Sequence, residues 1–463
     1  MLEDTIAAVS TPRGRGGVAL LRVSGADAIA VCEGIFEAKN GKPLREAPSR
    51  YAVYGSVYTT DANGERRAID DALVTVFRAP ASFTGEDTVE IACHGGILLT
   101  ETVLTALLVA GARSAEAGEF TRRAFLNGKM GLSSAEALGN LLEARTQEQI
   151  LLAHNGMNGK TEGVCADIYA RLRHLLASVY VCIDYPDEDL AELSPDQMIQ
   201  EIDGCLRELG ALRDTYRTGH AVAEGIATVI CGRPNVGKSS LYNRIVGRNA
   251  AIVTDVEGTT RDVLTETAAL GRVTLRLSDT AGLHDTSDRV ERIGIARAKE
   301  ALAEAELILA LFDASAPVSD EDTALCEELP AQRGVSIAVI NKSDLAGGEI
   351  PAFYRDRFAH CVAVSARTGE GMRALADLVE TLFTDGALDL SRDAVLANAR
   401  QHAAVQRAIG ALEAAKRALS AAMPMDLCCT DVESAMEYLC ELDGRSVSED
   451  LVSEIFSHFC VGK

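Results

Sequence analysis

The sequence lacks the features of a membrane protein or an exported protein. No apolar run is long enough to cross a bilayer. The first ten residues, MLEDTIAAVS, are acidic and have neither the basic nor the apolar stretch of a signal peptide. We therefore expect a cytoplasmic protein without a membrane partner.

A basic segment is also missing. The formal net charge is −23, and each of the four segments defined below is acidic. Proteins that bind nucleic acid by neutralising phosphate groups normally carry a basic block. Any contact with RNA must therefore use a local patch or be shared with a partner.

Cysteine pairs with the spacing of zinc or redox motifs are absent as well. The 12 cysteines are scattered singly, except for the neighbours Cys428 and Cys429, and no C-x-x-C pair occurs. Neither a zinc site nor a redox motif is supported. We expect most of these cysteines to be small buried hydrophobic residues in a reducing compartment.

What is present is the composition of a globular chain with more than one domain. The 463 residues are 47% hydrophobic and 24% charged. Residues 1–119 indicate an α/β domain: GGVALLRVSG, DDALVTVFRAP and EDTVEIACHGG favour strands, and LLTETVLTALLVAGA favours a helix.

Two helical segments, 120–221 and 387–463, flank a third kind of sequence. In the first, Ile168, Leu172, Leu175, Val179 and Ile183 follow helical spacing. The second contains three helix patterns, and Ser448 is a possible N-cap for the last. Because the ends of a compact domain often lie close together, we expect the middle module to be inserted into one discontinuous helical domain.

The middle module, 222–386, alternates short apolar strands with helical stretches. The strands are IATVICG, VTLRLSDTAG, LILALFDAS, VSIAVINKSD and HCVAVSA. This alternation predicts a parallel sheet with crossover helices. The predicted fold class is therefore a multidomain α/β plus all-α protein.

A phosphate-binding pattern lies in this module. GRPNVGKS, from Gly232 to Ser239, fits G-x-x-x-x-G-K-[ST] between a strand and a helix. The glycines let backbone N–H groups approach phosphate, Lys238 is suited to the β- and γ-phosphates, and the Ser239 hydroxyl is suited to Mg²⁺. The alternative is an ordinary strand–helix loop.

Three later motifs favour a GTPase. DTAG, from Asp279 to Gly282, ends a strand. Its Asp279 carboxylate can hold Mg²⁺ through water, and the N–H of Gly282 can contact the γ-phosphate. NKSD, from Asn341 to Asp344, ends another, and its final carboxylate suits the two N–H donors on the edge of guanine. SAR, from Ser365 to Arg367, offers a backbone N–H to the guanine oxygen. The predicted module is thus a P-loop, Ras-like GTPase.

The loop between the first two motifs, TDVEGTTRD, holds a predicted switch threonine that binds Mg²⁺. Thr260 is preferred, although spacing does not separate it from Thr259. Leu283 follows DTAG and cannot orient water as glutamine does in Ras-like enzymes. Arg261 could act as an internal arginine finger or form an ion pair of the switch loop.

These motifs and the chain ends resemble one family. GRPNVGKSSLYNRIVGRNAAIVTDVEGTTRDV is similar to the GTPase domains of the TrmE–Era group. DTIAAVSTPRGRGGVALLRVSG, SFTGEDTVEIACHGG, GEFTRRAFLNGKMGLSSAEAL, IDYPDED and FCVGK resemble the tRNA-modification GTPase family MnmE, also called TrmE. The resemblance covers essentially the whole chain.

The resemblance implies an N-terminal α/β domain that dimerises and binds tetrahydrofolate (1–119), a discontinuous helical domain (120–221 and 387–463) and an inserted GTPase domain (222–386). It implies a K⁺-dependent, dimerisation-activated GTPase that works with the flavoprotein MnmG (GidA) as a heterotetramer. Together they would install a 5-carboxymethylaminomethyl or aminomethyl group on the wobble uridine of certain tRNAs. The implied cofactors are GTP, Mg²⁺, K⁺ and 5,10-methylenetetrahydrofolate (with 5-formyltetrahydrofolate as an analogue), and FAD and NADH through the partner.

By the same resemblance, the GTP-binding residues are Asn235, Val236, Gly237, Lys238, Ser239, Ser240, Thr254, Asp255, Val256, Glu257, Gly258, Thr259, Thr260, Asp279, Thr280, Ala281, Gly282, Asn341, Lys342, Ser343, Asp344, Ser365, Ala366 and Arg367. The implied Mg²⁺ ligands are Ser239 and Thr260, and the implied K⁺ ligands are Asn235, Thr254, Val256 and Thr259. A cation beside the phosphates would stabilise developing charge as an arginine finger does. Lys238 and Glu291 are the implied catalytic residues here; the alternative for Glu291 is a surface carboxylate.

For folate the resemblance implies Arg22, Glu90, Lys129 and Lys463. A carboxylate suits a pterin edge, and cations suit a glutamate tail. Cys460 is implied in tRNA modification but not in GTP hydrolysis, and the alternative is a minor packing residue. Its CVGK ending lacks the pattern of a prenylation box. We expect Leu451, Ile455, Phe456 and Phe459 to anchor the last helix.

Three residues depart from the family pattern. Val461 stands where the family usually has isoleucine, Ser278 stands where an apolar residue is commoner, and Glu257 adds a carboxylate to the loop of the implied K⁺ site. Two other functions stay open at this point: a binding switch such as a ribosome-assembly GTPase, and an inactive scaffold. The absence of a basic RNA-binding module disfavours the first. Intact Lys238 and Asp344 disfavour the second.

Overall fold

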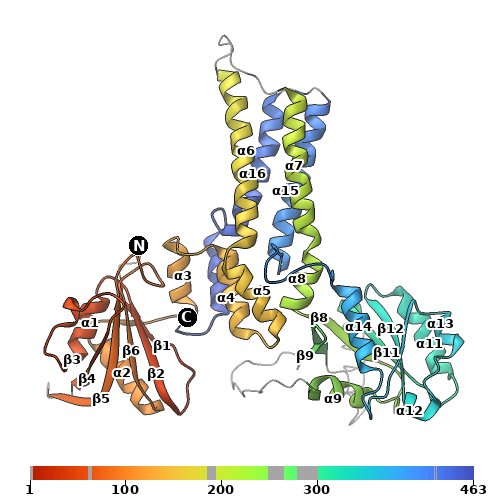
Figure 1. Ribbon diagram of the computed structural model, residues 1–463, viewed down its shortest axis with the longest axis horizontal. Coiled ribbons are helices and arrows are strands. Elements are labelled where there is room, and N and C mark those ends of the chain that lie inside the picture. Colours follow the sequence, from red (N-terminus) through yellow and green to blue (C-terminus); the bar gives the residue numbers. More distant parts are fainter. Residues whose placement is uncertain are drawn as a thin grey trace. The chain divides into compact units, whose positions relative to one another are not determined.

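The computed structural model describes residues 4–60, 65–184, 194–248, 265–278, 301–421, 423 and 425–462 (Figure 1). The chain divides into two compact units. The first comprises Met1–Gly139 and Cys440–Lys463, and the second comprises Asn140–Leu439. The first unit is therefore built from two stretches of chain that are far apart in sequence.

A seven-stranded sheet forms the first unit, in the order β3-β4-β5-β6-β2-β1-β7. Neighbouring strands are antiparallel except β1 and β7, which are parallel. The strands are β1 (Ile6–Val9), β2 (Gly16–Ser24), β3 (Phe36–Ala38), β4 (Ala52–Thr60), β5 (Arg66–Phe77), β6 (Thr88–Gly95) and β7 (Arg113–Ser114). The helices are α1 (Ala28–Ile35), η1 (Leu44–Glu46), α2 (Ile97–Val109), α3 (Glu119–Leu126), the start of α4 (Leu132–Glu143), the end of α16 (Met425–Asp443) and α17 (Glu449–Ser457). The three strands and the helix predicted in this region are confirmed.

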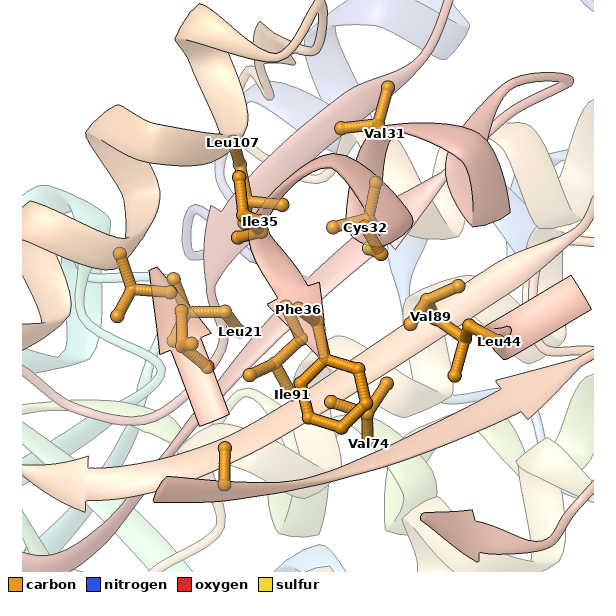
Figure 2. Close-up of a cluster of buried hydrophobic side chains, with 14 of the residues drawn as sticks. Leu21, Val31, Cys32, Ile35, Phe36, Leu44, Val74, Val89, Ile91 and Leu107 are labelled. Atoms are coloured by element: carbon orange, nitrogen blue, oxygen red, sulfur yellow. The ribbon is translucent and has the colours of Figure 1, made fainter. Parts of the chain in front are cut away.

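Alternation along the strands gives this sheet two different faces. On one face Leu21, Val74, Val89 and Ile91 are buried against α1 and α2 (Figure 2). Cys32 lies within this core, as expected for a cysteine acting as a small hydrophobic residue. This face holds the unit together.

The opposite face carries the polar residues of interest. Ile6 and Ala8 of β1 pack there with Phe120 of α3 and with Phe83 from the loop between β5 and β6. The same face of β2 and β6 carries the neighbouring pair Arg22 and Glu90. Function is therefore to be sought on this second face, since the first is filled by apolar side chains.

The last helix closes the first unit. Ser448 accepts a hydrogen bond from the backbone N–H of Leu451, which confirms the predicted N-cap of α17. Val452 and Phe456 are buried with Leu132 and Ala135 of α4, and Ile455 and Phe459 pack against them. The prediction for Leu451 is wrong: its side chain is exposed, because Val452 occupies the inward position of the first turn.

Long helices and a second sheet form the other unit. The helices α6, α7, α15 and α16 run side by side (Figure 1), and Lys416 of α15 pairs with Asp203 of α7 at 2.6 Å. Ile168, Leu172, Leu175 and Val179 are buried, as their spacing predicted. The described helices of this unit are α5 (Gln147–Met157), α6 (Lys160–Asp184), α7 (Pro195–Asp214), α8 (Tyr216–Ala223), α9 (Lys238–Arg248), α11 (Asp320–Glu328), η3 (Leu329–Ala331), α12 (Ser343–Ala346), α13 (Ala352–Arg355), α14 (Met372–Phe383) and α15 (Ala399–Ser420), together with the remaining parts of α4 and α16.

The second sheet has six strands in the order β13-β12-β11-β8-β10-β9. They are β8 (Ile226–Cys231), β9 (Thr265–Leu270), β10 (Val273–Ser278), β11 (Leu307–Asp313), β12 (Val335–Asn341) and β13 (His360–Ala363). All neighbours are parallel except β9 and β10. The five predicted strands are confirmed, and among the described residues of this sheet the edge strand β9 was not predicted.

The order of this sheet fixes where a ligand belongs. The chain passes from β8 to β9 and β10 on one side and then crosses to β11 on the other side of β8. Ligands of such sheets bind beyond the carboxyl ends of the strands, where the order reverses. That point is the loop that follows Cys231.

Candidate nucleotide site

The segment from Gly232 to Ser239 joins β8 to α9, as the motif predicted, and its last two residues are the first two of the helix. Gly232 has φ 147° and Gly237 has φ 102°. A Cβ at Gly237 would collide with the side chain of Asn341, and one at Gly232 would collide with the carbonyl oxygen of Leu311. Both positions therefore require glycine, on grounds of conformation and space.

Lys238 closes this loop upon itself. Its ammonium donates to the carbonyl oxygens of Gly232 at 2.8 Å and of Arg233 at 3.0 Å. Burial lowers the pKa of the ammonium. The Lys238 ammonium is thus held beside the loop, at the N-terminus of a helix of 11 residues. A cation beside a helix N-terminus is an arrangement suited to phosphate.

Asn341 joins the phosphate loop to the predicted guanine region. Its side-chain nitrogen donates to the carbonyl oxygen of Val236 at 2.8 Å, and its side-chain oxygen accepts from the N–H of Ala366 at 3.0 Å. The residue is buried. One amide therefore positions two loops that are more than 100 residues apart in sequence.

The guanine region is further held by ion pairs. Lys342 pairs with Asp313 at 2.6 Å, and Asp344 pairs with Arg367 at 3.3 Å. Burial would raise the pKa of Asp313, but hydrogen bonds from Lys342 and Ser315 lower it below its ordinary value. The Asp344 side chain is 15% exposed, so its carboxylate is partly shielded from water.

Sequence analysis missed two of the supporting residues. Asp313 ends β11, and this position at the carboxyl end of a parallel strand was an available signal. Arg244 of α9 donates to the carbonyl oxygens of Ala366, at 2.8 Å, and of Arg367. Nothing in the local sequence indicates that contact, because it depends on how α9 packs on the sheet.

The structure brings together the described part of the predicted site. Asn235, Val236, Gly237, Lys238, Ser239 and Ser240 lie in one loop and the start of α9, and Asn341–Asp344 and Ser365–Arg367 lie at the carboxyl ends of β12 and β13. Asn235 has φ 63°, which is uncommon outside glycine. Outside the described residues lie Thr254, Asp255, Val256, Glu257, Gly258, Thr259, Thr260, Arg261, Asp279, Thr280, Ala281, Gly282, Leu283, Glu291 and Lys463.

On the sheet of the first unit, Arg22 and Glu90 form a pair. The Arg22 Nη2 atom lies 2.8 Å from Glu90 Oε1, and Nε also donates to this oxygen at 3.0 Å. The guanidinium lies 5.1 Å from the ring centroid of Phe83 and 5.7 Å from that of Phe120. Lys129 does not join the pair: its ammonium donates to the carbonyl oxygen of Pro80 at 2.9 Å.

A buried ion cluster lies on the same face, and sequence analysis missed it. The Arg123 side chain is 1% exposed and pairs with Asp4 at 2.7 Å, Glu119 at 3.0 Å and Glu86 at 3.3 Å. Arg113 also pairs with Glu119. Burial would raise the pKa of Glu119, but hydrogen bonds from both arginines lower it. GEFTRRAFL gives no hint that its second arginine is the buried one.

The C-terminal tail docks on the first unit. Val461 forms an antiparallel bridge with Ala117, and Gly118 N–H donates to the Cys460 carbonyl oxygen at 3.4 Å. The Ser10 hydroxyl donates to the Gly462 carbonyl oxygen at 3.0 Å. Cys460 itself is exposed, and its thiol is available to solvent.

None of the helices in the part of the chain that the structure describes combines the length and apolarity needed to span a membrane. Among the same residues, no three or more His, Cys, Asp or Glu side chains are grouped as metal ligands.

Family models match nearly the whole chain. The model described as GTP-binding protein TrmE N-terminus matches residues 5–129, and the model described as MnmE helical domain matches residues 132–460. Curated proteins named tRNA modification GTPase MnmE are similar over their full length. The protein from Symbiobacterium thermophilum is 44% identical, and that from Clostridioides difficile is 38% identical, each over 100% of both chains.

Among solved structures, a single-residue variant of Era from Aquifex aeolicus bound to GDP.AlF4- is 25% identical, with a TM-score of 0.28, over 40% of this chain and 65% of that one. The family assignment follows from the full-length relatives and both family models. The chain belongs to the MnmE family of tRNA modification GTPases.

Proposed function

We propose that this chain binds GTP and hydrolyses it in the course of tRNA modification. The observation that carries the proposal is the Asn341 side chain, which joins the phosphate loop to the loop of Ser365–Arg367. This link supports the proposal, because it holds the two loops that would bind phosphate and guanine at one end of the sheet. The curated relatives are named for the same activity.

Each described residue has a role suited to its chemistry. Lys238, already drawn to the carbonyl groups of the loop, would bind the β- and γ-phosphates, and Ser239 would bind Mg²⁺. The Asp344 carboxylate would accept hydrogen bonds from the two N–H groups on the guanine edge. Ala366, whose N–H already donates to Asn341, lies in the loop proposed to face the guanine oxygen.

Potassium dependence is a finer part of the proposal. Asn235 adopts the left-handed conformation within the phosphate loop, which is compatible with a side chain turned toward a cation beside the phosphates. With Thr254, Val256 and Thr259 it would complete the K⁺ site, and two such domains would pair during hydrolysis. Glu291 would position the water. Hydrolysis in K⁺ buffer should be much faster than in Na⁺ buffer, and equal rates would refute this part.

The proposed second site uses the opposite face of the first sheet. Arg22, Glu90, Lys129 and Lys463 would hold a tetrahydrofolate that supplies one carbon atom. The half-buried ring of Phe83 beside Arg22 supports a flat ligand, whereas the ring of Phe120 is buried beneath it and only helps to place the guanidinium. Cys460 would take part in the modification step. We also propose that the segments 1–119, 120–221, 222–386 and 387–463 act as the four parts described above.

Reconstitution tests the proposal as a whole. The chain would be combined with its flavoprotein partner, FAD, NADH, GTP, methylenetetrahydrofolate and unmodified tRNA, and the wobble uridine would be analysed by mass spectrometry. We expect a modified uridine that depends on GTP. Hydrolysis of GTP without any modified uridine would leave a GTPase whose role is only to gate partner binding.

A further inference from the structure

Arg233, the second residue of the phosphate loop, makes a contact that the proposed chemistry does not use. Its Nε atom lies 3.4 Å from Oδ1 of Asp322 on α11. The Arg233 side chain is 23% exposed, whereas that of Asp322 is only 2% exposed. A charged contact thus links the loop to a helix that follows β11.

Asp322 needs this partner. Its Oδ2 accepts from the N–H of Ser319 at 3.0 Å, as part of the capping box that begins α11. Within the described structure, no hydrogen bond satisfies Oδ1 of Asp322 or Nε of Arg233. A nearly buried carboxylate with half of its oxygens unsatisfied is costly, so the guanidinium is held beside it.

The surroundings of Asp322 fix its position. Asp322 lies on α11, and Cys326 of the same helix is buried in one apolar cluster with Tyr354 and Phe312. The Tyr354 ring packs on Phe312 with centroids 4.3 Å apart. Phe312 precedes Asp313, which holds Lys342 of the guanine motif. The helix that carries Asp322 is therefore anchored to the same strand that supports the guanine region.

The backbone of Arg233 is the link to the phosphates. Its carbonyl oxygen is one of the two that receive the Lys238 ammonium. A shift of the Arg233 backbone would therefore move the cation that is meant to meet phosphate. Neither Arg233 nor Asp322 is expected to touch the nucleotide.

We propose that the Arg233–Asp322 pair is a positioning device for the phosphate loop: it fixes the backbone that holds Lys238 and so sets the affinity for nucleotide. The inference rests on the proposed function, because it takes this loop as the nucleotide site. Its loss should weaken GDP and GTP equally, since both ligands carry the phosphates that the loop holds. In kinetic terms KM should rise while kcat stays nearly constant.

The test is a double-mutant cycle on the full-length chain. Arg233→Met, Asp322→Asn and the double variant would be compared by titration with fluorescent GDP and by steady-state GTP hydrolysis. Each single variant should raise the Kd for GDP and the KM for GTP about tenfold, with kcat changed less than about twofold. The double variant should be no weaker than the worse single one, because the two side chains act as a unit.

Two additional variants separate positioning from general damage. Arg233→Lys keeps the charge and should recover part of the affinity, although it cannot reproduce the geometry of the guanidinium. Arg171→Met also removes an arginine from an ion pair in the same unit, with Glu208, but that pair does not involve the phosphate loop. This variant should leave the Kd unchanged. Circular dichroism and the midpoint of thermal unfolding would be recorded for each variant.

Three outcomes would decide the matter. A lower unfolding midpoint with unchanged Kd and KM would make the pair merely structural and overturn the inference. Single-variant effects that multiply in the double variant would overturn it too. Failure of the unaltered chain to bind GDP or GTP would instead refute the proposed function.

Discussion

The two candidate sites differ in how their residues are distributed along the sequence. The candidate nucleotide site is a set of short contiguous motifs, because backbone groups of one loop and two strand ends would do most of the binding. The site on the first sheet is made from single side chains of separate elements. Arg22 and Glu90 become neighbours only through the register of β2 and β6. A contiguous site can be read from a motif, whereas a dispersed one requires the fold.

The largest expected effect concerns the support of the dispersed site. Arg123→Met would leave Glu86 and Glu119 buried without their shared cation, and breaking a buried pair in this way costs about 3–5 kcal/mol. We expect the first unit to unfold at a lower temperature and to lose protection from hydrogen exchange around α3. GTP hydrolysis at 25 °C should persist.

Arg45→Met is the matched control. Its pair with Glu33 is on the surface, where the Arg45 side chain is 70% exposed, so calorimetry should detect little change. Loss of GTPase activity in Arg123→Met to the same degree as loss of protection would mean that the two sites are not separable.

A smaller effect is expected from Asp344→Asn at the contiguous site. Loss of a charge-assisted hydrogen bond costs roughly 1.5–3 kcal/mol, so the Kd for GTP should rise about ten- to hundred-fold. Xanthosine triphosphate has a carbonyl in place of the amino group of guanine, so an asparagine amide can donate to it. Its affinity should therefore rise in the variant. Equal affinity for GTP before and after the change would refute the guanine role of Asp344.

The third prediction concerns the pH dependence of stability, which we expect from a histidine packed beside the second sheet. His220 of α8 lies 3.2 Å from Glu224 and 3.1 Å from Glu306, which is also near Arg276 of β10. The two carboxylates, Glu224 as an ion pair with Nδ1 and Glu306 as a hydrogen-bond partner of Nε2, raise the pKa of His220 to about 9. The stabilisation that they provide is therefore complete below about pH 6.5 and is lost as pH rises through about 9.

Thermal unfolding between pH 6 and pH 10 would test this. The unfolding midpoint of the unaltered chain should fall more steeply above about pH 8 than that of His220→Gln, which has no titrating ring. Parallel curves for the two proteins would contradict the prediction.

The smallest effect on stability is expected at the tail. Cys460 is exposed, so Cys460→Ser should leave the unfolding midpoint and GTP hydrolysis unchanged while reducing tRNA modification. Gly462→Ala is a useful companion, because Gly462 has φ 95° and an added Cβ would collide with the Val9 carbonyl oxygen. It should undock the tail and reduce modification with the thiol intact. Loss of GTP hydrolysis in Cys460→Ser would assign the residue a structural role instead.

These differences explain what could be predicted from the sequence. The parallel strands were found because each is a short apolar run, and all of them except β11 lead into a motif; Lys238, Asn341 and Asp344 followed from those motifs. The edge strand β9 was missed because TETAAL lacks a continuous apolar pattern. The role of Arg123 was missed because a buried and an exposed arginine look alike in sequence, and only the packing of α3 distinguishes them.

The folded position of the tail has a consequence for biosynthesis. Ser10 and Gly462 are hydrogen-bonded across 452 residues of chain, and Leu132 is covered by Phe456. At roughly 5–20 residues per second, a ribosome needs about 15–60 s to make the stretch between the two parts of the first unit. During that time the apolar side of α4 waits without its natural cover. A nascent chain of this protein should therefore be a substrate for chaperones until its last helix emerges.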